Sequence, residues 1–154
     1  MEDITDKRSA ALAFLKSQDV GVLATCSSEG SPHVRTVYYA ADDSFAVYFV
    51  TLTNTRKVKD LAASGKAAFV VSSSTIPATL QIEGVVADHT ETATIDESVR
   101  NLNETLFAKG SQFSPLTHMD ADTVRFLKLT PTWIRWGDFS AGQSSGEVFT
   151  EIAP

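Results

Sequence analysis

Three short apolar segments near the start of the chain limit the fold more than any other feature. They are rich in residues typical of strands and span residues 20–26, 33–41 and 45–52. The connections between them, Ser-Glu-Gly-Ser-Pro and Asp-Asp-Ser, are turn sequences of hairpin length. Because a parallel crossover needs a dozen or more residues, consecutive segments with such short links must run antiparallel. The pattern favours an antiparallel barrel or sandwich over a parallel α/β sheet.

The remaining chain alternates strands with short helices. Further strands are predicted over residues 67–73, 79–89, 124–131 and 132–139. Helices are predicted over residues 5–17, 55–64 and 95–109. Gly65 is placed to end the second helix in a left-handed conformation, and Gly84 marks a bulge or a close approach within its strand. The segment 110–122, which contains His118, is the least regular, and the tail 140–154 is expected to be mobile or to lie over a partner.

Length and composition indicate one domain over residues 1–154, with residues 1–18 forming an N-terminal helix. Apolar residues make up 43% of the 154, enough for a core without disulfides or a structural metal. The net charge of -6 argues against nucleic acid or an anionic membrane as a partner. The charged, amphipathic N-terminus and the lack of a long apolar run predict a cytoplasmic protein.

The stretch 45–61, FAVYFVTLTNTRKVKDL, predicts a local site for an anion. A buried strand ends at Asn54-Thr55, and a helix then opens with Arg56 and Lys57. Helix N-termini leave backbone N–H groups unpaired, so Thr55 as the cap and two adjacent cations would present donors and positive charge to one phosphate. An exposed, solvated first turn is the alternative interpretation of the same residues.

Other polar residues leave both a functional and a structural interpretation open. Arg35 lies in the apolar strand VRTVYYA, where it either provides a second cation or faces solvent on an alternating strand. The three histidines, His33, His89 and His118, lack the spacing of metal ligands, so no metal site is expected. Cys26 is the single cysteine, which excludes an intramolecular disulfide, and its position at the end of an apolar strand is typical of a small buried residue.

These features together resemble the pyridoxamine 5′-phosphate oxidase-like, FMN-binding split-barrel family. The motifs that carry the resemblance follow one another in the family's order over roughly residues 15 to 138. They are Arg35-Thr36-Val37-Tyr38-Tyr39, Val50-Thr51, Thr55-Arg56-Lys57 with Leu61, Glu83-Gly84 and Trp136. The resemblance implies a six- to seven-stranded antiparallel split β-barrel that forms a homodimer with two cofactor sites at the interface.

The resemblance also implies a role for each matching residue. The strand from Arg35 through Thr36 and Val37 to Tyr38 would run along the flavin, with Arg35 donating to it. Val50 and Thr51 would touch the flavin, while Arg56 and Lys57, beside Thr55, would hold the FMN phosphate. Trp136 would approach the cofactor from the other subunit.

The chain departs from the family oxidase at three places. Ala40 stands where the oxidase has a lysine implicated in binding the substrate phosphate. Thr79 stands where the oxidase has a cofactor-binding glutamine, and Gln81, two residues on and on the same strand face, would substitute. The Arg-x-His-x-Arg segment that grips pyridoxal phosphate has no counterpart after Trp136. Oxidation of vitamin B6 is therefore not expected.

The resulting expectation is an FMN-dependent oxidoreductase that transfers a hydride or electrons to a small-molecule substrate, with no catalytic residue assigned. A reductase of the same fold that uses a deazaflavin is one alternative. A non-catalytic flavin- or haem-binding stress or sensor protein is the other.

Overall fold

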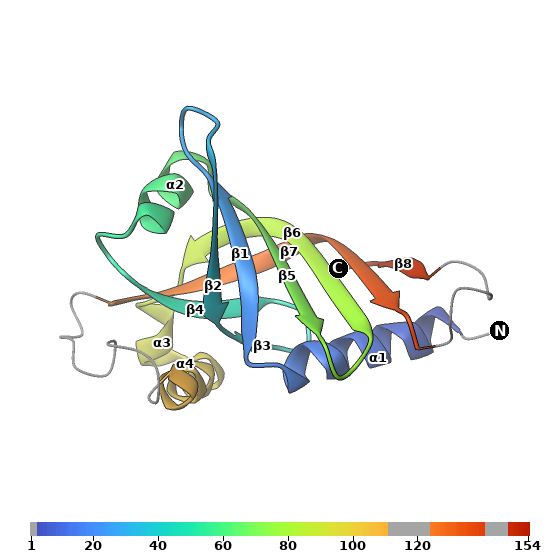
Figure 1. The fold of residues 1–154 in the computed structure, drawn as a ribbon. Coiled ribbons are helices and arrows are strands. Elements are labelled where there is room, and N and C mark those ends of the chain that lie inside the picture. Colours follow the sequence, from blue (N-terminus) through green and yellow to red (C-terminus); the bar gives the residue numbers. More distant parts are fainter. Residues whose placement is uncertain (1–2, 111–123, 141–147) are drawn as a thin grey trace.

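The predicted first hairpin is present, and it begins a single antiparallel sheet (Figure 1). The computed structural model describes residues 3–110, 124–140 and 148–154. Its strands are β1 (Val20–Cys26), β2 (Pro32–Tyr38), β3 (Ala40–Ala41), β4 (Val47–Leu52), β5 (Lys66–Ser73), β6 (Ala78–Asp88), β7 (Val124–Asp138) and β8 (Phe149–Ile152). Its helices are α1 (Ile4–Ser17), α2 (Arg56–Ser64), α3 (Thr92–Ile95) and α4 (Glu97–Gly110). The described residues contain no helix long and apolar enough to cross a membrane.

The strand order β2-β1-β5-β6-β7-β4-β3 places two consecutive strands at opposite ends of the sheet. β2 and β3 are separated by Tyr39 alone, so the sheet has to curl round for the chain to pass between its two ends (Figure 1). β3 pairs with β4, and β2 pairs with β1, but no ladder joins β2 to β4 within the described residues. The sheet is therefore a barrel that is open along one seam, which confirms the expected split-barrel fold.

The prediction of one strand over 33–41 is wrong, because the chain turns at Tyr39. The Tyr39 N–H still donates to the carbonyl of Asp19 at 3.1 Å, in register with the last β1–β2 pair, and the next residue, Ala40, pairs with β4 instead. Its side chain is fully buried, and its hydroxyl donates to the carbonyl of Leu15 at 2.5 Å. Anchoring the ring on α1 directs Tyr39 out of the strand and separates β2 from β3.

The predicted division into two strands, 124–131 and 132–139, is also wrong, since β7 runs unbroken through Pro131. Its pairing with β6 shifts between Glu83 and Gly84, where Thr132 is the extra residue on the β7 side. A bulge is a place where a strand tolerates a proline, because a ladder donor is missing there anyway. The expected bulge at Gly84 is confirmed: a Cβ at this position would lie 2.1 Å from the Thr130 carbonyl oxygen.

The C-terminal tail is only partly as expected. Residues 149–152 form β8, which pairs with β7, and Ile152 is buried in the core. The expectation of a mobile tail is wrong for this part, because an apolar side chain and a short ladder anchor it. Residues 141–147 and residues 111–123, which include His118, lie outside the described residues, so the expectations for these two segments stay predictions. Within the described residues the strand count is eight instead of seven: the break at Tyr39 and β8 each add one strand, and the merger of the two predicted strands into β7 removes one.

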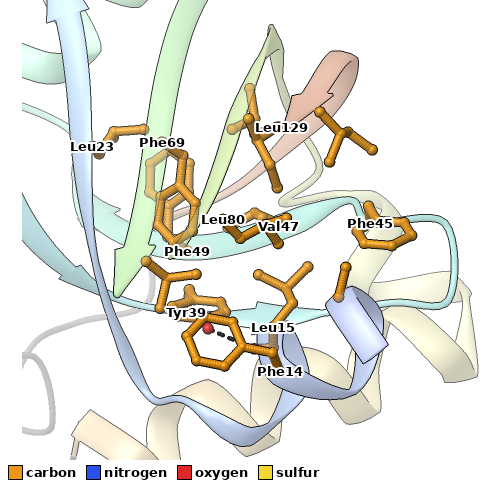
Figure 2. Packing of buried hydrophobic residues seen from close by; sticks show 14 of the residues in the cluster. Phe14, Leu15, Leu23, Tyr39, Phe45, Val47, Phe49, Phe69, Leu80 and Leu129 are labelled. Atoms are coloured by element: carbon orange, nitrogen blue, oxygen red, sulfur yellow. Dashed lines mark hydrogen bonds between the residues drawn. The ribbon is translucent and has the colours of Figure 1, made fainter. Parts of the chain in front are cut away.

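The core lies inside the curled sheet and is covered by α1. Figure 2 shows Phe14, Leu15 and Tyr39 packed against buried side chains from the strands. A second, smaller cluster fills the other face of β4, where Tyr48 stacks on Phe126 at 5.4 Å between ring centroids and α4 contributes Leu106. β4 is thus buried on both faces, which fixes the strand that leads into α2.

Candidate functional site

Helix α2 begins with backbone donors that no side chain caps. Thr55 occupies the N-cap position, as expected, with an extended backbone, but its side chain makes no capping hydrogen bond. Its hydroxyl instead contacts the Thr51 hydroxyl at 3.0 Å and donates to the Leu52 carbonyl at 3.1 Å. The first-turn N–H groups of α2 are therefore left available to an anion. At the other end Gly65 takes the predicted left-handed conformation, with φ 68°.

A buried carboxylate on α2 organises polar side chains from the neighbouring strands. Asp60 is 4% exposed, and its Oδ2 accepts hydrogen bonds from the Thr25 hydroxyl and from Nδ1 of His33, both at 2.7 Å. The guanidinium of Arg35 donates to the Thr25 hydroxyl at 2.7 Å and lies 3.8 Å from Oδ2 of Asp60. These contacts fasten α2 to β1 and β2, and they hold Arg35 at the start of the helix.

The charges at this end of the barrel influence one another. We call Arg35, Arg56 and Lys57 the cation cluster. Burial lowers the pKa of Lys57, and the nearby Arg35 lowers it further. Burial also lowers the pKa of Arg35. The charge of Asp60 raises this pKa in part, and the charge of Arg56 lowers it further. Hydrogen bonds from His33 and then Thr25 lower the pKa of Asp60 despite its burial, so this carboxyl is ionised. Three cations and one carboxylate leave a net positive charge of two.

The residues expected along β2 lie on two faces of the sheet. Arg35 pairs with Leu23, and Val37 with Gly21, so both face the barrel interior, and Val37 is buried in the core. Thr36 and Tyr38 lie on the outer face, because successive strand residues point in opposite directions. The structure therefore brings Arg35, but not its two outward neighbours, to the cation cluster.

The residues expected at the end of β4 are divided in the same way. Thr51 is buried on the interior face and contacts Thr55, which leads directly into α2. Val50 lies on the opposite face and packs against the smaller hydrophobic cluster. Thr51 therefore supports the start of α2, whereas Val50 is separated from it by the strand.

Thr79 and Gln81 share the outer face of β6 and are half-buried, as their spacing predicts. Gln81 pairs with Val70 of β5, which pairs with Val22 of β1 opposite Thr36. Three strand spacings of about 4.8 Å put Gln81 roughly 14 Å from Thr36 across the sheet. These two residues belong to the outer face and lie apart from the cation cluster.

Trp136 does not fit the role expected for it. It is 5% exposed and packs on Phe14 of its own chain, with ring centroids 5.2 Å apart. A ring buried in its own core cannot also approach a cofactor held by another subunit. Trp133, three residues earlier, lies on the outer face and lines a cavity of about 320 Å³ with Val34 and Gln81. If residues 124–138 had been taken as one strand, the alternation of side chains would have predicted Trp133 on the outer face and Trp136 on the inner face.

Asp60, Thr25 and His33 were missed by reasoning from the sequence. Two local signals were available: His33 and Arg35 are two residues apart on one strand, and Asp60 lies one helical turn after Arg56 and Lys57. Neither signal says that the strand and the helix meet. Within the described residues, no group of three His, Cys, Asp or Glu side chains is arranged to hold a metal ion.

Solved structures share this fold at low sequence identity. A haem-binding protein from Mycobacterium smegmatis matches with a TM-score of 0.69 and 16% identity over 99% of this chain and 59% of its own. A pyridoxamine 5′-phosphate oxidase-related, FMN-binding protein from Nostoc punctiforme gives 0.63 and 16% over 98% and 89%. An F420 reductase gives 0.63 and 23% over 79% and 93%. No curated protein sequence matches the chain.

The sequence itself matches the model of one protein family. The match covers residues 8–136, from α1 through β7, and so includes every strand that surrounds the cation cluster. The strand order of this chain is the one that forms the split barrel described above. On this match, which spans most of the chain, the protein belongs to the pyridoxamine 5′-phosphate oxidase family.

Proposed function

We propose that the protein binds FMN and uses it to transfer a hydride or electrons to a small-molecule substrate. The observation that carries the proposal is the cation cluster, which meets the uncapped N-terminus of α2 in a chain of this family. Bound FMN would supply the redox chemistry, since its flavin ring accepts and donates a hydride or single electrons. The protein's part is to bind, orient and tune that cofactor.

The charge of the site matches the phosphate of FMN. A phosphate monoester carries between about -1.5 and -2 at neutral pH. The cation cluster and Asp60 leave a net charge of +2 beside the helix start. Arg56 and Lys57 would hold the phosphate with the first-turn N–H groups, and Arg35, held by Thr25, would face the same anion.

The flavin ring would lie along β2, the end strand of the sheet. β2 pairs with β1 on one side, so its other edge presents backbone N–H and C=O groups that no ladder uses within the described residues. A flavin pyrimidine edge needs such donors and acceptors. Arg35 beside this edge would favour the anionic, reduced form of the ring by its positive charge.

We infer a homodimer from the outer face of the sheet. Val34 is 64% exposed there, and it borders the cavity of about 320 Å³ that Trp133 lines. Val20 on β1 and Val85 on β6 are further exposed apolar residues of this outer face. Large exposed apolar side chains on one face of a sheet often mark an interface. A second copy covering this face would bring another chain beside β2, so the cofactor sites would lie at the interface.

The substrate is expected to differ from that of the family oxidase. Ala40 forms β3 and is buried, so it offers no charge to a substrate phosphate. A small, uncharged residue at this position favours a substrate other than pyridoxamine phosphate.

The test begins with the absorption spectrum of the purified protein, because FMN, a deazaflavin and haem absorb differently. Titration of the apo-protein with FMN and with riboflavin then measures the contribution of the phosphate. Reduction of the bound flavin by NADH or NADPH, followed by turnover with an electron acceptor, supports an oxidoreductase. A protein that fails to bind FMN, or binds riboflavin equally well, contradicts the proposal. A flavin that binds but never cycles argues for a sensor instead of an enzyme.

A further inference from the structure

His33 is fixed in a way that an ordinary surface histidine is not. Its side chain is 17% exposed, and its Nδ1 lies 2.7 Å from Oδ2 of Asp60. That oxygen also accepts from the Thr25 hydroxyl, whose own oxygen accepts from Arg35. One carboxylate therefore orients His33 directly and Arg35 through Thr25, on the same face of β2.

The protonation of this pair follows from its hydrogen bonds. The pKa of Asp60 is lowered, first by the hydrogen bond from His33, so the carboxylate is ionised and can only accept. The proton between the two groups is therefore on Nδ1 of His33. Asp60 uses Nδ1 and leaves the other ring nitrogen, Nε2, for another partner, and 17% of the His33 side chain is exposed.

We propose that His33, oriented by Asp60, is a further ligand of the phosphate at the start of α2, to which it donates from Nε2. This inference rests on the proposed function. Donation from Nε2 while Nδ1 keeps its proton makes the bound ring an imidazolium. Asp60 on one side and the phosphate on the other stabilise that charge, whereas Arg35, Arg56 and Lys57 oppose it.

Two substitutions separate the two ring nitrogens. His33→Asn keeps an amide donor near the position of Nδ1, so Asp60 retains its partner, but it removes the group that faces the phosphate. His33→Gln places an amide donor near the position of Nε2 and gives up the bond to Asp60. If His33 is a phosphate ligand, His33→Asn weakens FMN binding by about 10- to 100-fold, the usual loss for a hydrogen bond to a charged group. His33→Gln recovers part of that loss.

Riboflavin is the matched probe, because it lacks only the phosphate, and its affinity should be the same for all three proteins. A loss of FMN affinity without a loss of riboflavin affinity assigns the effect of the substitution to the phosphate.

The outcomes are distinct. Equal FMN affinity in wild type and His33→Asn would reduce His33 to a structural partner of Asp60 and overturn the inference, while FMN binding by both would leave the proposed function intact. A wild type that binds no FMN, or binds it no better than riboflavin, refutes the proposed function and this inference together.

Discussion

Replacing Lys57 with Met should weaken FMN binding and leave the apo-protein at least as stable as the wild type. The two effects have one cause. Burial and then Arg35 lower the pKa of Lys57, so the folded protein disfavours the charged amine relative to the unfolded chain. That penalty is fully present at neutral pH and disappears only as the pH rises through the pKa of the unfolded chain. Met removes the charge and keeps most of the side-chain packing.

The size of the binding effect follows from the contact that is lost. A hydrogen bond to a charged group is worth about 1.5 to 3 kcal/mol, so the dissociation constant for FMN should rise about 10- to 100-fold. When the FMN concentration is far above the dissociation constants of both proteins, bound FMN stabilises the variant by about 1.4 to 2.7 kcal/mol less than it stabilises the wild type. For a chain of this length that is roughly 3 to 10 °C less increase in Tm on adding FMN.

The measurement is thermal unfolding of both proteins with and without FMN, combined with a direct titration. Lys59→Met is the matched control, because Lys59 carries the same charge on the same helix but is exposed. Its effect on FMN affinity should stay within about twofold, as expected for a distant, screened charge. Riboflavin affinity should be unchanged in both variants.

Two results would refute the reasoning. Equal losses of FMN affinity in Lys57→Met and Lys59→Met would mean that only the overall charge matters and that the cation cluster is not the phosphate site. A clear fall in the Tm of apo Lys57→Met would mean that the amine is stabilised in the folded protein, contrary to the direction of its pKa shift.

Three further predictions concern the framework. Gly84→Ala should cost about 1 to 3 kcal/mol of unfolding free energy in a denaturant titration, because the new Cβ would overlap a backbone carbonyl of β7; wild-type stability would show that the bulge can shift. Val34→Asp should convert a dimer into monomers in sedimentation experiments, whereas Ile95→Asp, exposed on α3, should not; equal masses for all three proteins would place the interface elsewhere. Burial raises the pKa of Tyr39, and the nearby Asp19 raises it further. The stabilisation that comes from the protonated hydroxyl is complete below the pKa of an unfolded tyrosine, and it is lost as the pH rises through the higher pKa of Tyr39 in the folded protein. Tyr39→Phe should therefore lose less stability than wild type between about pH 9 and 11, and an unchanged slope would assign the alkaline loss to another group.

Local chemistry was sufficient wherever a residue's role depends on its immediate neighbours. Gly65 after an amphipathic helix and Gly84 within a strand were predicted correctly, because a left-handed cap and a bulge are short-range features. The division at Tyr39 was not predictable, since Val37 to Ala40 reads as continuous strand. The chain turns there only because the ring is buried against α1, which no local pattern records.

The candidate site divides along the same line. Arg56 and Lys57 were predicted from the strand that ends just before them, and Arg35 from its place in an apolar strand and from the family motif. Asp60 was missed because its partners lie 35 and 27 residues earlier in the chain, at Thr25 and His33. A carboxylate one turn into a basic helix reads as a solvated residue until the fold brings β1 and β2 against it.

The position of Asp60 explains how the protein keeps three cations together without a ligand. Alone, Arg35, Arg56 and Lys57 would repel one another, and burial adds to the cost for two of them. Asp60 offsets part of that repulsion and fastens α2 to β1 through Thr25, so Arg35 and the helix that carries Arg56 and Lys57 are in place before an anion arrives. Binding then needs little rearrangement of the backbone, which leaves more of the electrostatic gain as affinity. A single carboxylate also leaves the three cations of the cluster with a net charge of two, opposite in sign to a phosphate dianion.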